Sequence, residues 1–176
     1  MDGSIVFVAS HPMSVVAFLL PHIRTLKPHA SVQVFTNSNE STLLEKYGVD
    51  VPVEFVPIER PIALWSDVKA LWMLYWKFKT SRPVAVHTMT PKAGLLGMLA
   101  AFLAKVPVRV HSFTGQVWVT HEGFMRKLLR AADRAVAAMA TDVLVDSPSQ
   151  RDFLIAQNVL NPRRALVLGA GSMCGV

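Results

Sequence analysis

Short apolar runs alternate with longer helical patterns along the whole chain. Continuous apolar runs of this length are typical of parallel strands that helices bury on both faces. The pattern predicts strands over Ile5–Ala9, Val32–Thr36, Val53–Ile58, Val84–His87, Val108–Phe113, Asp142–Val145 and Ala165–Leu168. It predicts helices over Ser14–Leu26, Glu40–Tyr47, Ser66–Thr80, Pro91–Lys105, Phe124–Ala140 and Pro148–Gln157. The expected fold is a single α/β domain over residues 1–176, with a Rossmann-like, doubly wound parallel sheet of about seven strands.

Several helix ends are marked by residues with specific capping chemistry. Thr90 before Pro91 predicts a helix that begins with a hydroxyl N-cap and a proline in its first turn. Ser147–Gln150 repeats this signal and adds the glutamine of a capping box. Gly48 is expected to end one helix, and Pro21 predicts a kink or break within the first one.

Composition is consistent with one compact domain. The 176-residue chain is 52% hydrophobic and 17% charged, which supports a sizeable core and excludes a disordered chain. Cys174 is the only cysteine, so no internal disulfide is possible and a reducing compartment is expected. Met1–Ser4 lacks the features of a signal peptide, and the longest apolar run, Ala93–Ala104, is shorter than the roughly 20 residues that span a bilayer. We therefore expect a cytoplasmic protein.

The net charge of +6 is concentrated in two segments. Residues 60–82 hold five basic residues against Asp67 alone, and residues 126–134 hold a second cluster that only Asp133 counters. Such patches serve phosphate-bearing substrates, anionic membranes or nucleic acids, and they also occur as solvated helix faces. Because the chain carries no recognised nucleic-acid motif, no nucleic-acid partner is expected.

Polar loops follow three of the predicted apolar strands. In an open parallel sheet, ligands bind beyond the carboxyl ends of the strands, where the strand order reverses. If the order is the common 3-2-1-4-5-6, this point lies between the first and fourth strands, and the loop after the fifth strand flanks it. The candidate substrate-binding residues in these loops are Ser10, His11, Thr88, Thr90, Lys92, Thr114, Gly115 and Gln116.

Lys92 belongs to the most specific of these loops. It lies in the first turn of a predicted helix, where unpaired backbone N–H groups and the helix dipole favour an anion. A lysine there is mildly unfavourable to the helix itself, which favours a phosphate or carboxylate cradle over a solvated side chain.

The histidines form no recognisable metal site. His87 ends a predicted strand and is interpreted as a core histidine, whereas His11 precedes a proline on a loop and is freer to face a ligand. His111 and His121 bracket the third loop, and no short His, Cys or Asp spacing supports a metal. Ser10–Ser14 also lacks the glycines of a dinucleotide-binding fingerprint.

The predicted helix over Ser66–Thr80 carries more apolar surface than packing requires. Its polar residues fall on one stripe, and the remaining arc is far wider than the roughly 100° that contact with a sheet uses. Aromatic side chains beside basic ones are typical of helices that lie at a membrane surface. The candidate membrane-contact residues are Trp65, Trp72, Trp76, Lys77 and Lys79; the alternative is that the tryptophans belong to the core.

Two stretches, Val86–Gly94 and Val108–Gly115, resemble the N-terminal domains of family-4 (group 1) glycosyltransferases. Ile58–Arg60, Asp146–Arg151 and the closing residues 169–176 fit the same pattern, so the resemblance covers essentially the whole chain. The relatives that it indicates build capsule, exopolysaccharide or O-antigen repeat units on a lipid-diphosphate carrier in bacteria.

This resemblance implies the N-terminal half of a GT-B fold, in which two Rossmann-like domains face each other across a cleft. It implies a retaining transfer, without a metal or other cofactor, from a nucleotide sugar to a lipid-linked sugar acceptor. The acceptor would bind this domain, and a C-terminal domain absent from the chain would hold the nucleotide and the family's paired glutamates. Residues 1–176 alone are therefore expected to be inactive, and the full-length enzyme is expected to work at the cytoplasmic surface of the inner membrane.

Two departures from the family pattern leave the catalytic residues unassigned. Many relatives carry a glycine pair where this chain has Ser10–Ser14, and His-Gly where it has Thr114-Gly115. Two other functions stay open: a non-catalytic, membrane-recruiting subunit of a split glycosyltransferase, and the N-terminal domain of a sugar-nucleotide epimerase. The donor sugar, the acceptor sugar and the linkage stay open as well.

Overall fold

A computed structural model describes residues 3–59, 61 and 63–172 of the chain. Cys174 and the other closing residues, 173–176, lie outside the described residues, as do Met1, Asp2 and Arg60. The expectations that involve these positions are therefore not addressed by the structure.

Seven parallel strands form one sheet, in the order β3-β2-β1-β4-β5-β6-β7. The predicted fold class and strand order are both confirmed. The strands are β1 (Ser4–Ala9), β2 (Ser31–Thr36), β3 (Val53–Phe55), β4 (Ala85–Met89), β5 (Val108–Phe113), β6 (Asp142–Val145) and β7 (Ala165–Val167).

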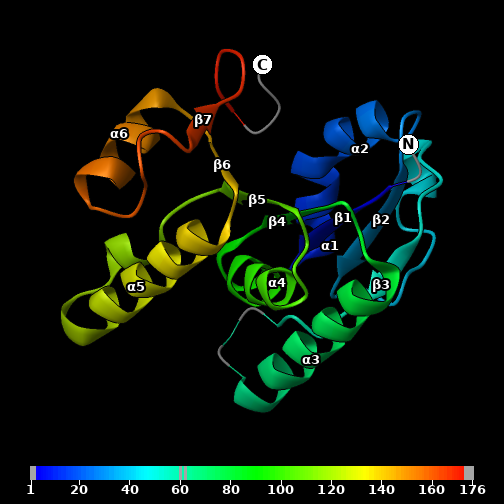
Figure 1. Ribbon diagram of the computed structural model, residues 1–176, viewed down its shortest axis with the longest axis horizontal. Helices are drawn as coiled ribbons and strands as arrows, with labels where there is room; N and C mark the ends of the chain where they lie inside the picture. The colour runs from blue at the N-terminus through cyan, green and yellow to red at the C-terminus, as the bar shows by residue number, and fades with distance from the viewer. Residues whose placement is uncertain (1–2, 60, 62, 173–176) are drawn as a thin grey trace.

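Helices lie on both faces of this sheet, as Figure 1 shows. The first face carries α1 (Pro12–Ser14), the π-helix η1 (Val15–Leu19) and α2 (Leu20–Leu26). The second face carries α3 (Leu64–Ser81), α4 (Pro91–Leu103) and α5 (Gly123–Met139), with α4 packed between the other two. The remaining elements are α6 (Pro148–Ala156) and the 3₁₀ helices η2 (Glu45–Tyr47) and η3 (Val117–Thr120).

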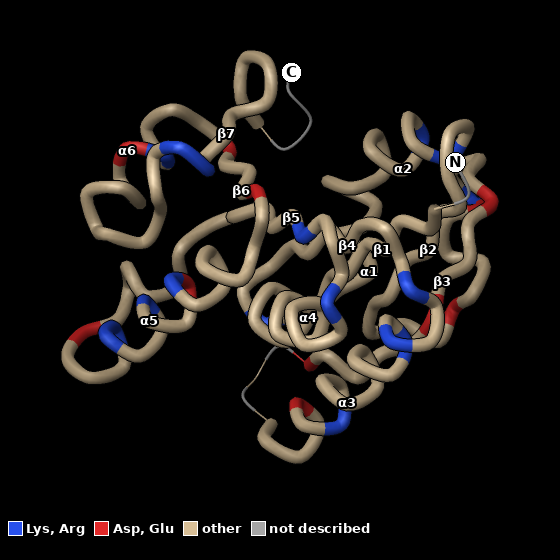
Figure 2. The backbone as a smooth tube through the Cα atoms, in the orientation of Figure 1, with Lys and Arg blue, Asp and Glu red and all other residues tan. Residues whose placement is uncertain are grey.

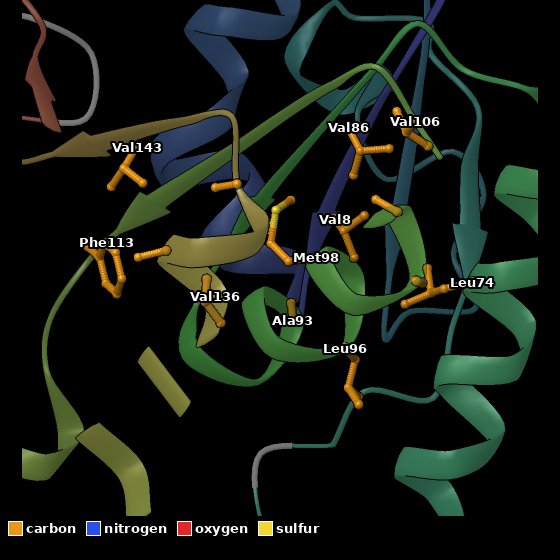
Figure 3. Close-up of a cluster of buried hydrophobic side chains, with 14 of the residues drawn as sticks. Val8, Leu74, Val86, Ala93, Leu96, Met98, Val106, Phe113, Val136 and Val143 are labelled. Atoms are coloured by element: carbon orange, nitrogen blue, oxygen red, sulfur yellow. The ribbon is translucent and has the colours of Figure 1, made fainter. Parts of the chain in front are cut away.

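Alternate residues of each central strand enter opposite cores. In β1, Val6 and Val8 join the core beneath α3 and α4, whereas Phe7 and Ala9 join the core beneath η1 and α2. Figure 3 shows Val8 and Val86 on the strands beside Met98 and Leu74 from the covering helices. This two-sided burial explains why the strand sequences are continuously apolar.

The predicted helix over Glu40–Tyr47 is wrong. Only η2 forms there, and it ends at Gly48, whose left-handed φ of 73° confirms the predicted stop. The segment before it is rich in Asn, Ser and Thr, and the Ser38 hydroxyl accepts a hydrogen bond from the backbone N–H of Glu40 at 3.2 Å. Side chains of this kind offer the backbone an alternative to helical hydrogen bonds.

At the kink or break predicted near Pro21, the helical run continues without a break, but a π turn interrupts its α-helical hydrogen bonding. η1 precedes α2, and Pro21 lies in the first turn of α2, where a missing N–H costs no hydrogen bond. β3 ends at Phe55 rather than at Ile58, because Pro57 cannot donate to a strand partner.

Candidate functional site

The loops after β1 and β4 meet at the carboxyl edge of the sheet. β1 pairs with β2 on one side and β4 on the other, so the strand order reverses there, as predicted. The Ser10 backbone N–H donates to Thr90 Oγ1 at 3.3 Å, and the two hydroxyls share a hydrogen bond of 2.8 Å. Two of the predicted site residues are thus joined across the reversal point.

Thr90 is held in an unusual backbone conformation. Its φ of 72° and ψ of 145° lie in a region that residues with a side chain rarely adopt, at a cost of about 1–3 kcal/mol. Its side chain makes no N-cap hydrogen bond to α4, so the predicted capping role is wrong. The hydroxyl instead shares a hydrogen bond with Ser10, on the loop after β1.

Lys92 lies in the first turn of α4, as predicted, but its ammonium group is engaged. It forms an ion pair with Asp67 Oδ1 at 2.7 Å and donates a hydrogen bond to the carbonyl of Pro61. Both charged side chains are mostly buried. Lys92 therefore ties the start of α4 to the start of α3, and these contacts oppose the mild destabilisation expected of a cation at a helix start.

His11 is the N-cap of α1. Its Nδ1 accepts a hydrogen bond from the backbone N–H of Met13 at 3.2 Å, and the residue is half-buried. The side chain is thus placed at the mouth of the β1 loop, beside Ser10, with one ring nitrogen used for capping.

Two buried pairs lie beneath the carboxyl edge. His87 Nε2 and Ser112 Oγ share a hydrogen bond of 2.7 Å, and His111 Nδ1 and Thr88 Oγ1 share one of 2.8 Å. Burial lowers the pKa of both His87 and His111 to about 3, so both rings are neutral at physiological pH. His87 is a core histidine, as interpreted from the sequence, and Thr88 serves His111 inside the core instead of reaching the edge.

Two glycines of α4 let the helix approach the second of these pairs. A Cβ on Gly94 would meet Cε1 of His111 well inside van der Waals contact, and a Cβ on Gly97 would lie 2.7 Å from the Thr88 methyl group. Close helix–strand packing at these positions therefore requires glycine.

The loop after β5 flanks the reversal point, as predicted. Gly115 has a φ of 156°, with open space where a side chain would project. Gln116 is half-buried, and its Nε2 is fully buried without a hydrogen-bond partner. Trp118 then anchors the loop: its ring stacks on Phe153 with a centroid distance of 5.5 Å, and its Nε1 donates to Asp133 at 2.7 Å.

Asp133 is a buried acid on α5, away from the carboxyl edge of the sheet. Burial raises its pKa to about 6, and the hydrogen bond from Trp118 opposes that shift only in part. Because this carboxylate is committed to the Trp118 indole, its role is to position η3 and the loop before it.

Sequence reasoning missed Asp146 as a candidate. It is the first residue after β6, and its backbone N–H donates to Oε1 of Gln150 at 2.7 Å. The Ser147 N-cap is confirmed by a 3.1 Å hydrogen bond from the Gln150 N–H, but the glutamine of the predicted capping box reaches Asp146 rather than Ser147. Oδ1 of Asp146 is buried without a partner. Its position directly after a predicted strand was the available signal.

No three His, Cys, Asp or Glu side chains within the described ranges are grouped so that they could hold a metal ion. A groove lined in part by Lys79, Arg82 and Lys105 lies at the opposite edge of the sheet, where the strands begin and where α3 and α4 end. Cations there complement the negative ends of the helix dipoles, which gives them a structural role.

Comparison with known proteins identifies one family. Residues 11–171 match the model of the glycosyl transferase 4-like domain. The chain is 32% identical over 146 residues to a capsular polysaccharide biosynthesis glycosyltransferase, CapM, from Staphylococcus aureus. It is 31% identical over 149 residues to a UDP-Gal:α-D-GlcNAc-diphosphoundecaprenol α-1,3-galactosyltransferase from Escherichia coli. Each match covers 83% of this chain but 38% of the relative, so the chain spans well under half the length of these proteins.

Solved structures share the fold at lower identity. The Acinetobacter baumannii MurG structure has a TM-score of 0.66 at 17% identity and covers 97% of this chain and 46% of its own. A UDP-GlcNAc 2-epimerase from Methanocaldococcus jannaschii has a TM-score of 0.71 at 14% identity, over 96% and 45% of the two chains. At these identities the likeness shows the fold alone.

Proposed function

The chain belongs to the glycosyl transferase 4-like domain family, and on this premise we propose that it is the acceptor-binding half of a retaining glycosyltransferase. The full-length enzyme moves a sugar from a nucleotide sugar to a lipid-diphosphate-linked sugar in the synthesis of a bacterial surface polysaccharide. Both relatives support this proposal, since one is a capsular polysaccharide biosynthesis glycosyltransferase and the other is named for a diphosphoundecaprenol acceptor. The likeness to epimerases is one of fold and supports no epimerase activity.

The observation that carries the proposal is the junction of Ser10 and Thr90 at the strand reversal. A hydroxyl pair held there by a strained backbone forms a polar floor next to the first turn of α4. Unpaired N–H groups at a helix start favour a diphosphate. We assign Ser10, His11, Thr90 and Lys92 to the diphosphate, and Thr114, Gly115 and Gln116 to the side nearest the sugar.

Lys92 can be tested against its own ion-pair partner. Lys92→Gln and Asp67→Asn both break the same ion pair, so both should lower the free energy of unfolding, by about 1–3 kcal/mol. Only Lys92→Gln removes the cation. It should weaken binding of a lipid-free GlcNAc diphosphate methyl ester by about tenfold to a hundredfold, because charge-assisted phosphate contacts have this magnitude. Asp67→Asn should leave binding unchanged or stronger.

The measurement is a nuclear magnetic resonance titration of each variant, beside urea unfolding. Equal affinity of Lys92→Gln and the parent chain would show that Lys92 only ties α4 to α3. If the parent chain binds neither this ester nor methyl diphosphate, the acceptor-site proposal itself is wrong.

We also propose that α3 contacts the surface of the inner membrane on its cytoplasmic side. In the described part of the chain, no helix combines the length and hydrophobicity needed to cross a bilayer. Trp65, Trp72 and Trp76 are nevertheless 90%, 62% and 48% exposed, and Lys79 is exposed beside them. Lys77 instead pairs with Glu54 and lies over the Phe35 ring, so we leave it out of the contact surface. Figure 2 shows basic positions on both α3 and α5.

Vesicle sedimentation tests this surface. The parent chain should bind vesicles that contain phosphatidylglycerol more strongly than neutral phosphatidylcholine vesicles. Trp65→Ser combined with Trp72→Ser should reduce that binding several-fold, whereas Phe102→Ser, which changes an exposed ring on α4, should not. Equal binding by the double variant and the parent chain would exclude α3 as the contact.

A further inference from the structure

Unsatisfied hydrogen-bonding groups are concentrated at the carboxyl edge of the sheet. Within residues 3–59, 61 and 63–172, the buried side-chain atoms without a partner are Thr36 Oγ1, Gln116 Nε2 and Asp146 Oδ1. Thr36 ends β2, Gln116 follows β5 and Asp146 follows β6. The buried polar groups deeper in the two cores are paired, for example Asp133 with Trp118. A buried group without a partner costs about 1–3 kcal/mol, so its confinement to one edge needs a reason.

Gln116 and Asp146 follow neighbouring strands whose ends are tied together. Phe113, the last residue of β5, is in register with Val145, the last residue of β6. The Gln150 side chain bridges the two ends: its Nε2 donates to the carbonyl of Phe113 at 3.3 Å, and its Oε1 accepts from the backbone N–H of Asp146. The strand ends that precede the two unsatisfied groups are therefore tied to each other by Gln150.

The loop after β7 fixes Asp146 from its other side. The backbone N–H of Ser172 donates to the carbonyl of Asp146 at 2.6 Å, and a Cβ on Gly171 would lie 2.9 Å from that same oxygen. Asp146 is thus held between β5 and the β7 loop, and its carboxylate oxygen stays without a partner although the backbone around it is fully engaged.

Resting on the proposed function, we propose that Gln116 and Asp146 form a sugar-hydroxyl subsite beside the diphosphate site. An amide N–H₂ donates and a carboxylate oxygen accepts, and a sugar hydroxyl can accept from the first and donate to the second. The acceptor then lies across the carboxyl edge, with its diphosphate over β1 and β4 and its sugar over β5 and β6. These two positions are separated by about two strand spacings, roughly 10 Å.

Charge decides which part of the acceptor lies on which side. A carboxylate repels a phosphate, so Asp146 excludes the diphosphate from the β5–β6 end, whereas the unpaired N–H groups at the start of α4 attract it to the other end. Burial raises the pKa of Asp146, because desolvation disfavours the charged form of the carboxyl group. A hydroxyl donor from a sugar would supply the missing interaction.

Paired variants and ligands test the subsite. Asp146→Asn keeps the shape of the side chain and removes the charged acceptor; Asp142→Asn, at the exposed amino end of β6, is the matched control. Each variant is titrated by nuclear magnetic resonance with GlcNAc diphosphate methyl ester, its 3-, 4- and 6-deoxy analogues, and methyl diphosphate. Asp146→Asn should bind the sugar diphosphate about tenfold more weakly and bind methyl diphosphate as the parent chain does. One deoxy analogue should bind the parent chain about tenfold more weakly than the complete sugar diphosphate does. The same analogue and the complete sugar diphosphate should bind Asp146→Asn with equal affinity.

Unchanged affinity of Asp146→Asn for the sugar diphosphate would overturn the subsite. Equal losses for the sugar diphosphate and methyl diphosphate would also overturn it, because the residue would then act on the whole edge. If the parent chain binds methyl diphosphate and binds every deoxy analogue equally well, the acceptor-site proposal is supported and only the subsite proposal is wrong. No binding of any ligand by the parent chain removes both proposals.

Discussion

Replacing Gly94 by alanine should destabilise this domain although alanine is the better helix former. The new Cβ would lie 3.0 Å from Nδ1 and 3.2 Å from Nε2 of His111, and closer still to Cε1. The imidazole cannot move aside freely, because its Nδ1 is bonded to Thr88 and its ring packs edge-on against Phe113 at 4.6 Å. Either the ring leaves its hydrogen bond or α4 moves away from the sheet.

The magnitude follows from three opposing contributions. Overpacking a core costs about 1–3 kcal/mol, and breaking the buried His111–Thr88 hydrogen bond costs about 1–3 kcal/mol more. The higher helix propensity of alanine returns about 1 kcal/mol. We expect Gly94→Ala to lower the free energy of unfolding by about 1–5 kcal/mol, which for a chain of this length lowers the melting temperature by roughly 2–20 °C.

Urea unfolding of four proteins measures this effect: the parent chain, Gly94→Ala, His111→Ala and the double variant. Removing the imidazole makes room for the new methyl group, so the double variant should be more stable than the sum of the two single losses predicts, by about 1 kcal/mol or more. The packing assigned to α4 would be refuted if Gly94→Ala were as stable as the parent chain, or if the two losses were additive.

Three further predictions concern the edge and its supports. Asp133→Asn should stabilise the chain at pH 7 by about 1–3 kcal/mol and have little effect near pH 4. The reason is the raised pKa of Asp133, which makes the free energy of unfolding fall as pH rises from about 4 to about 6. Urea unfolding that gives the same stability difference at both pH values would contradict this. Thr90→Ala should lower the free energy of unfolding by about 1 kcal/mol, because it removes the hydrogen bond to Ser10. Thr90→Gly should be about 1 kcal/mol more stable than Thr90→Ala, because glycine adopts a positive φ without strain. Thermal melts that rank the alanine variant above the glycine variant would exclude backbone strain at Thr90. Residues 1–176 alone should transfer no sugar from labelled nucleotide sugars to a lipid-diphosphate acceptor, and turnover above a no-protein control would show that a second domain is not needed.

The candidate site was only partly predictable. The reversal point followed from the apolar strands and the expected strand order, so the sequence predicts that the loops of Ser10 and Thr90 meet. The hydrogen-bond partners of each side chain could not be predicted. Lys92 is engaged by Asp67, a residue 25 positions away, and Thr88 is drawn into the core by His111, which enters from the neighbouring strand. These contacts depend on the separation of α3, α4 and the sheet, and sequence spacing does not contain that separation.

Local sequence alone determined most of the elements and the fold class. Continuous apolar strands, the Ser147 cap and Gly48 act within a few residues, so their outcome can be read without knowing the fold. The tertiary structure decided which polar groups are satisfied. Thr90 exchanged a helix cap for a partner on the loop after β1, 80 positions away in the chain. The tertiary structure also leaves Gln116 Nε2 and Asp146 Oδ1 without partners after neighbouring strands. A hydrogen bond requires two groups to meet, and most of these groups are far apart in the chain.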